Sequence, residues 1–133
     1  MNRSEVILDS DVIISWLRGH NTYAQAISKL LGEGHILVWT PVSIAEIFAG
    51  VRKSEEELVE GLLLVLESVQ ITQEIGKKAG EYLKDFAKSH HVEVADALIA
   101  ATCHIHGFPL WTLNRKHYPM KDIRFFSPPT ASH

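Results

Sequence analysis

Apolar residues occur along the chain in short runs, separated by longer segments in which they recur with helical spacing. The runs at 6–8 and 36–39 have the length and composition of buried strands. Shorter apolar runs at 69–71, 110–112 and 123–125 are candidates for a third, fourth and fifth strand. Because parallel strands need long crossover connections, strands that alternate with helices predict an α/β fold with a mostly parallel sheet of about five strands.

Six helices are predicted around these strands from the spacing of apolar residues and from residues that start or stop helices. Asn21 is a candidate cap for the second helix, and Pro41 suits the first turn of the third. Ser54 and Glu57 have the spacing of a capping box for the fourth helix, and Gly107 ends the last one. The expected ranges are 11–18, 21–31, 41–50, 54–66, 74–88 and 93–106.

The bulk composition predicts one globular domain. A chain of 133 residues with 46% hydrophobic and 22% charged residues can bury a core without disulfides. We expect this domain over residues 1–126 and a flexible tail at 127–133. The longest apolar run, 62–66, is too short to cross a membrane, and the residues before Val6 do not resemble an export signal. Cys103 is the single cysteine, so a reducing cytoplasm is the expected location.

Three carboxylates follow or interrupt apolar segments. Asp9 directly follows the first strand, Glu46 lies among apolar residues of the third helix, and Asp96 lies in the apolar first half of the last helix. A buried carboxylate is costly unless it is paired or bound to a cation. In parallel α/β sheets, ligands bind outside the carboxyl ends of the strands, where these elements can meet. Converging carboxylates suit Mg²⁺ or Mn²⁺, which can activate a water for attack on a phosphodiester.

Each acid also has a structural explanation. The helix after the first strand needs one cap, and Asp9, Ser10 or Asp11 can provide it. Glu46 can lie on a narrow solvent-exposed stripe of its helix. Glu93 is explained by the favourable dipole at a helix N-terminus, although it is also a candidate neighbour of the site. The combination of acids is therefore more informative than any one of them.

The net charge of −3 is unusual for a protein that binds nucleic acid, since phosphate binding draws on lysine and arginine. Acids that hold divalent cations lower this count, yet they create a positive site once the cation is bound. The net charge therefore does not exclude a nucleic-acid substrate.

Four segments resemble the motifs of PIN-domain nucleases, and more narrowly those of VapC-type toxins of type II toxin–antitoxin pairs. They are LDSDVII at 8–14, SIAEIFAG at 43–50, ADALIAAT at 95–102 and TLNRKHY at 112–118. Each segment alone is degenerate, but their order and spacing span nearly the whole chain.

This resemblance implies a three-layer α/β/α sandwich and RNA cleavage that depends on Mg²⁺ or Mn²⁺. It implies metal coordination by Asp9, Glu46 and Asp96. It also implies a cognate antitoxin that occupies a groove beside the site and blocks it, and a homodimer of the toxin.

The fourth segment departs from the family pattern. Many members have an acid where this chain has His117, and Asn114 stands in the same turn. Imidazole binds transition metals but is a poor ligand for Mg²⁺. We therefore expect one firmly held metal, a second weaker one, and better activity with Mn²⁺ than with Mg²⁺. Asp11, two residues from Asp9, is a candidate to replace the missing acid.

Other polar residues of these segments are candidates for supporting roles. Thr112 and Asn114 can hydrogen-bond a metal-bound water or a phosphate oxygen. Ser10 and Ser43 can orient the metal ligands. Arg115, with the lysine that follows it, is the candidate for a phosphate contact.

Three alternatives stay open. The Asp-Ser-Asp sequence after a strand also resembles phosphatases of the haloacid-dehalogenase type, but the chain is short for that fold and no acidic pair follows Asp96. The histidine at position 117 is compatible with a catalytically weak module that only binds RNA or a partner. A PIN nuclease that works in RNA processing without an antitoxin is the third.

Overall fold

Four strands form one parallel sheet in the computed structural model of the chain, which describes residues 4–128. They are β1 (Glu5–Leu8), β2 (Ile36–Trp39), β3 (Glu67–Ser68) and β4 (Leu110–Trp111). The order across the sheet is β3-β2-β1-β4, so β1 lies between β2 and β4. The parallel sheet predicted from the alternation of strands and helices is confirmed.

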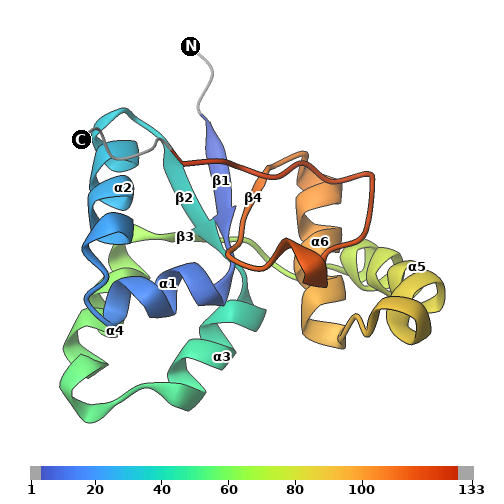
Figure 1. Ribbon diagram of the computed structural model, residues 1–133, viewed down its shortest axis with the longest axis horizontal. Helices are drawn as coiled ribbons and strands as arrows, with labels where there is room; N and C mark the ends of the chain where they lie inside the picture. Colours follow the sequence, from blue (N-terminus) through green and yellow to red (C-terminus); the bar gives the residue numbers. More distant parts are fainter. Residues whose placement is uncertain (1–3, 129–133) are drawn as a thin grey trace.

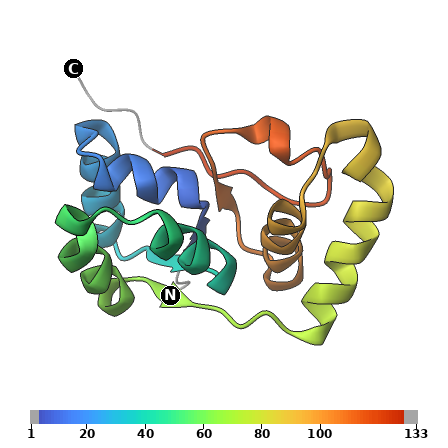
Figure 2. The ribbon, with the colours of Figure 1, turned by 90° about the horizontal axis from the view of Figure 1, so that it is seen from below.

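Six helices and two short 3₁₀ turns connect the strands within the described residues. The helices are α1 (Ser10–Leu17), α2 (Asn21–Gly32), α3 (Pro41–Gly50), α4 (Glu56–Val65), α5 (Gln73–His90) and α6 (Val94–His106); the turns are η1 (Lys53–Glu55) and η2 (Arg115–His117). Helices α1 to α4 lie on one side of the sheet and α5 and α6 on the other (Figures 1 and 2). The expected three-layer α/β/α sandwich is therefore present.

Alternate residues of the central strands divide the core between the two helical layers. Leu8 and Trp39 pack into the cluster formed with α1 to α4, whereas Ile7 and Val38 pack into the cluster under α5 and α6. All four side chains are at most 1% exposed. Side chains of a strand point alternately to its two faces, and both faces are apolar here because helices cover both.

Two of the expected strands differ from the structure. The third was expected at 69–71, but the residues that pair with β2 are those of β3, both of which are exposed at the sheet edge. An exposed edge strand does not need the apolar run from which it was predicted. The fifth, at 123–125, is reduced to a single bridge between Leu110 and Phe125. The described residues therefore form four strands instead of five.

Two expected helix starts are also wrong. His20, not Asn21, occupies the cap position of α2, and it caps without a side-chain bond. Ser54 lies inside η1, and α4 begins only after that turn. The bond that reaches back is made by Glu55, whose Oε1 accepts from the N–H of Arg52 at 3.0 Å. The capping interaction therefore belongs to the 3₁₀ turn that precedes the helix.

The start of α3 and the end of α6 are as predicted. The Thr40 hydroxyl accepts from the N–H of Ser43 at 3.3 Å, and Pro41 occupies the first turn of α3, where no N–H partner is needed. Gly107 ends α6 in the left-handed conformation with φ 71°, and its N–H donates to the carbonyl of Cys103 at 2.9 Å. Thr40 therefore sets where α3 begins after β2, and Gly107 sets where α6 ends before β4.

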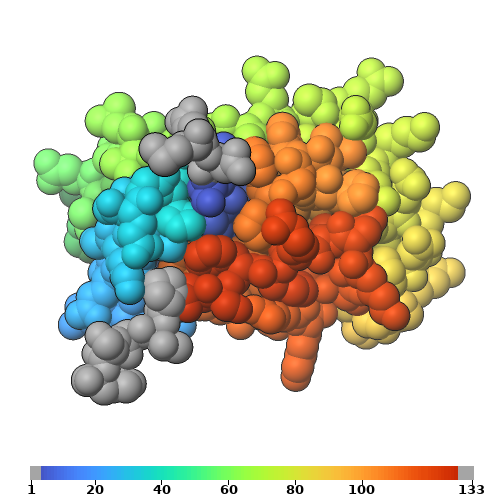
Figure 3. Space-filling view, turned by 90° about the horizontal axis from the view of Figure 1, so that it is seen from above, coloured from blue at the N-terminus to red at the C-terminus, as the bar shows by residue number. Residues whose placement is uncertain are grey.

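The chain after η2 returns to the amino end of the sheet. There the Phe126 ring lies 5.9 Å from that of Trp111 and 6.1 Å from that of His35. Seen from above, this red segment lies between the cyan region around the start of β2 and the orange α6 (Figure 3). Residues 129–133 of the expected flexible tail lie outside the described residues. Within residues 4–128, no helix has the length and hydropathy needed to span a membrane.

Candidate active site

A pocket of about 330 Å³ opens where β1 and β4 end. Its walls come from the start of α1, from α3, from the junction of α5 and α6, and from η2. The lining residues are Asp9, Ser10, Asp11, Glu46, His91, Glu93, Ala95, Asp96, Asn114 and His117. Five of these ten are carboxylic acids. The three acids expected as metal ligands therefore line one pocket, although they come from three separate segments of the sequence.

Asp9 is the most firmly held of these acids. Its side chain is 8% exposed, and its Oδ1 accepts from the N–H of Ser10 at 2.8 Å, so it also caps α1. Its Oδ2 accepts from the hydroxyls of Thr112 at 2.9 Å and Tyr118 at 2.7 Å. The helix cap and the pocket acid considered as alternatives for Asp9 are thus compatible. Three hydrogen-bond donors thus satisfy this buried carboxylate.

Asp11 is half-buried beside Asp9. Its Oδ2 accepts from the N–H of Leu113 at 3.1 Å and is 3.3 Å from the hydroxyl of Thr112. Its Oδ1 is buried and has no hydrogen-bond partner among the described residues. Burial raises the pKa of Asp11 from 3.8 to about 6, the negative charge of Asp9 adds to this rise, and the hydrogen bonds oppose it.

Glu46 and Asp96 face the same pocket from two helices. Glu46 is exposed as a side chain, contrary to the burial expected from its apolar neighbours, because it points into the pocket mouth. Its Oε1 accepts from the Ser10 hydroxyl at 3.1 Å. Desolvation raises the pKa of Glu46, and the charges of Asp9, Asp96 and Glu93 raise it further. Desolvation also raises the pKa of Asp96. The hydrogen bond from the Glu93 N–H and the imidazole of His117 oppose this rise.

The turn after β4 brings two further expected residues to the pocket. His117 and Asn114 both line it, and the Asn114 Nδ2 lies 3.0 Å from the His117 Nε2. The N–H of Asn114 donates to the Thr112 hydroxyl at 3.2 Å, which links this turn to the Asp9 carboxylate. The position where many family members have an acid is thus occupied by an imidazole that attracts Asp96.

Two expected residues lie elsewhere. Ser43 is fully buried, does not line the pocket, and its Oγ has no hydrogen-bond partner within residues 4–128. Arg115 points away from the acids: its guanidinium lies 4.8 Å from the centre of the Phe125 ring and donates to the Ser127 hydroxyl at 3.1 Å. In this conformation the arginine stabilises the returning C-terminal segment.

Two residues of the site were missed in the sequence. His91 follows α5 and lines the pocket with φ 56°, a left-handed conformation that is uncommon outside glycine. His91 lies outside the four motif segments, so no pattern in the sequence indicated it. Tyr118 ends the fourth motif segment, but no pattern indicated that its hydroxyl would reach Asp9.

The donors of the pocket suit a hard divalent cation. The site offers carboxylate oxygens from Asp9, Glu46 and Asp96, and the partnerless Oδ1 of Asp11 is a buried acceptor that a cation would satisfy. No three histidine, cysteine, aspartate or glutamate side chains of residues 4–128 are already close enough together to hold an ion. The chemistry of the donors therefore fits Mg²⁺ or Mn²⁺, and their spacing is more open than that of a closed metal site.

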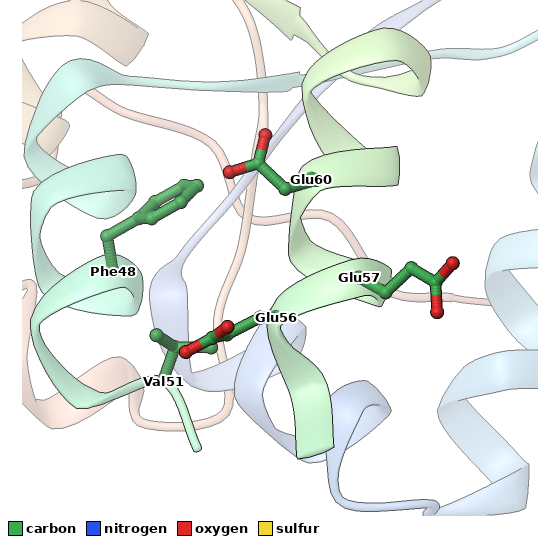
Figure 4. A pocket seen from close by; sticks show the side chains of 5 residues that line it. All are labelled: Phe48, Val51, Glu56, Glu57 and Glu60. Carbon is green, nitrogen blue, oxygen red and sulfur yellow. The ribbon is translucent and has the colours of Figure 1, made fainter. Parts of the chain in front are cut away.

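A second pocket of about 420 Å³ lies between α3 and α4. Its lining combines Phe48 and Val51 with Glu56, Glu57 and Glu60. Phe48 and Glu60 face each other across it, and Glu57 points to the other side of α4 (Figure 4). Helix α3 thus contributes Glu46 to the acidic pocket and, two residues later, Phe48 to this more apolar one.

Comparison with known proteins identifies the family. The PIN domain family matches residues 6–123. Ribonuclease VapC10 of Mycobacterium tuberculosis is 33% identical over 116 residues, which span 86% of this chain and 86% of that protein. Ribonuclease VapC19 of the same organism is 28% identical over 115 residues, 86% of this chain and 92% of the relative.

The fold has a close structural neighbour in the crystal structure of VapBC2 from Rickettsia felis bound to a DNA fragment from their promoter. The TM-score is 0.78 at 16% identity, and the match covers 94% of this chain and 99% of that one. The chain therefore belongs to the PIN-domain family. Within that family its relatives group it with the VapC-type proteins, and the resemblance of the four sequence segments is confirmed.

Proposed function

We propose that the chain is a metal-dependent endoribonuclease that acts as the toxin of a type II toxin–antitoxin pair. The observation that carries this proposal is the convergence of Asp9, Glu46 and Asp96 on one pocket at the carboxyl edge of the sheet. The names of the VapC relatives support ribonuclease activity. The absence of basic side chains other than histidine from the described lining indicates that a cation supplies the positive charge that RNA phosphates need.

In this proposal the residues in and around the pocket bind the metal, position its ligands or contact phosphate. Asp9, Glu46 and Asp96 hold Mg²⁺ or Mn²⁺, which when bound neutralises phosphate charge and lowers the pKa of a water. Thr112 fixes the Asp9 carboxylate, and Ser10 fixes that of Glu46. The other polar groups at the rim, His91, Asn114 and His117, are donors for phosphate oxygens.

The proposed protein partner is a cognate antitoxin. Several structural neighbours are complexes by their titles, among them a toxin–antitoxin complex from Klebsiella pneumoniae. Apolar side chains of α4 are unusually exposed here: Leu64 is 90% and Leu58 60% exposed. Exposed apolar side chains on α4 favour a protein partner at this helix. The homodimer implied by the family resemblance stays a prediction that gel filtration with light scattering tests.

Cleavage of total RNA by the free protein tests the function. We expect the wild type to cut RNA with Mn²⁺, more slowly with Mg²⁺, and not with EDTA. Replacing Asp9 with asparagine removes a ligand charge and should lower the cleavage rate by at least about 100-fold. Mapping of the cut ends identifies the RNA, and addition of a co-expressed antitoxin should stop cleavage.

The outcomes separate the alternatives. No cleavage by the wild type with either ion, in protein shown to be free of antitoxin, would favour a module that only binds. Equal rates with Mn²⁺ and Mg²⁺ across a concentration series would contradict the preference for Mn²⁺ expected from an imidazole in place of an acid at position 117. Cleavage that no antitoxin inhibits would favour a nuclease of RNA processing.

A further inference from the structure

Tyr118 lies behind the acidic pocket and does not line it. Its side chain is 2% exposed, and its hydroxyl donates to the Oδ2 of Asp9 at 2.7 Å. The bond joins residues 109 positions apart, one after β1 and the other after η2. A distance of about 2.7 Å is that of a well-formed O–H···O hydrogen bond.

The two oxygens of Asp9 are unequal because of this bond. Oδ2 accepts from Tyr118 and, at 2.9 Å, from Thr112. A carboxylate oxygen has two lone pairs, so two hydroxyl donors saturate Oδ2. Among residues 4–128, Oδ1 accepts only from the N–H of Ser10, at 2.8 Å, and keeps one lone pair free. Asp9 therefore offers one oxygen, with one open position, to the pocket.

We propose that Tyr118 is a positioning residue which, with Thr112, holds the Asp9 carboxylate so that Oδ1 alone is presented to a divalent cation. This inference rests on the proposed function, in which Asp9 is a metal ligand. Without the Tyr118 hydroxyl, Oδ2 regains an open lone pair, and only Thr112 and the N–H of Ser10 still hold the carboxylate. Outer partners of metal ligands typically change metal affinity about 10–100-fold.

The chain offers a matched control for removing this hydroxyl. Tyr82 is 3% exposed and donates to the Oδ1 of Asp122 at 2.6 Å. Asp122 lies outside the acidic pocket and also pairs with Lys78 at 3.0 Å. Tyr118→Phe and Tyr82→Phe therefore each remove one hydrogen bond from a buried tyrosine to a carboxylate, but only the first affects a proposed metal ligand.

Calorimetric titration with Mn²⁺ on the three full-length proteins, without RNA, measures the effect. We expect Tyr118→Phe to raise the Kd for Mn²⁺ by about 10-fold or more, and Tyr82→Phe to change it by less than about two-fold. In cleavage assays, Tyr118→Phe should raise the Mn²⁺ concentration at half-maximal rate and leave the KM for RNA unchanged. Thermal unfolding of all three proteins checks that the two variants are folded.

Several results would overturn the inference. An unchanged Kd in folded Tyr118→Phe would do so, as would an equal loss of affinity in Tyr82→Phe, since the effect would then be one of general stability. If Tyr118→Phe does not fold, Thr112→Val removes the other donor to the same oxygen. An unchanged Mn²⁺ affinity in Thr112→Val would then overturn the inference. Wild-type protein that binds no Mn²⁺ would remove the proposed metal dependence together with this inference.

Discussion

At the scale of single residues, the acidic pocket contains one carboxyl group that is poorly satisfied. Asp11 is half-buried next to Asp9, and its Oδ1 has no hydrogen-bond partner within the described residues. Such a group is costly to ionise in the absence of a cation. Asp11 therefore lowers the stability of the metal-free protein. Its Oδ1 remains available as an acceptor for a cation in the pocket.

This predicts a stability gain in Asp11→Asn. The folded protein holds the Asp11 proton with a pKa near 6 against an ordinary 3.8, so it binds this proton more tightly than the unfolded chain does. Stability is therefore lost as the pH rises from about 4 through about 6, and the penalty is complete above that range. We expect Asp11→Asn, in EDTA, to raise the Tm at pH 7.5 and to leave it unchanged at pH 4.

The exposed Asp85 of α5 provides the control, since Asp85→Asn removes one negative charge far from the pocket. A Tm of Asp11→Asn below that of the wild type at pH 7.5 would contradict the expected penalty. So would an equal gain in Asp85→Asn, because the effect would then come from the overall negative charge.

The sequence indicated Asp9, Glu46 and Asp96 because a charge inside an apolar segment is visible without a structure. It could not indicate Tyr118, since a buried tyrosine is ordinary and its partner is remote in the chain. The environment of Glu46 was misjudged for a related reason. Its apolar neighbours suggested burial, but the helix places it at the mouth of a pocket that only the assembled fold creates.

At the scale of elements, glycine has different roles at the end of α6 and inside α5. Gly107 has φ 71° and ends α6, whereas Gly80 lies inside α5 with a helical backbone; a methyl group added at either position meets no atom within 4 Å. The same substitution should therefore have opposite effects. Gly107→Ala forces an L side chain into the left-handed region and should cost about 1 kcal/mol. Gly80→Ala should stabilise by roughly 0.5–1 kcal/mol.

Thermal or denaturant unfolding of the two variants beside the wild type measures both signs. A Gly107→Ala variant as stable as the wild type would mean that α6 can end without the left-handed residue. Destabilisation by both changes would mean that α5 resists added volume at Gly80.

The strands that could be predicted from the sequence are those whose own side chains have the hydrophobic pattern of a buried strand. The central strands β1 and β2 are apolar on both faces, and the predicted ranges match them closely. The edge strand β3 carries exposed Glu67 and Ser68, so its identity comes from backbone pairing with β2 and not from its side chains. The prediction of a fifth strand was wrong because Phe125 forms only a single bridge, with Leu110.

At the scale of the whole molecule, an ion that binds only the folded pocket must raise the stability of the entire chain. At a free Mn²⁺ concentration of about 100 times the Kd, the expected gain is about 2.7 kcal/mol. Melting curves in EDTA and in increasing Mn²⁺ measure it, and Asp9→Asn should show little or none of the gain. A Tm that rises equally in both proteins would indicate that Mn²⁺ binds outside the acidic pocket.

The central position of β1 in the sheet also has a consequence for synthesis. Asp9 is made more than 100 residues before its hydroxyl partners Thr112 and Tyr118, and β1 is bordered by β4 from the same later region. A growing chain therefore lacks the full set of these contacts until translation has passed Tyr118. The complete acidic pocket therefore forms only after the segment that contains Thr112 and Tyr118 has been synthesised.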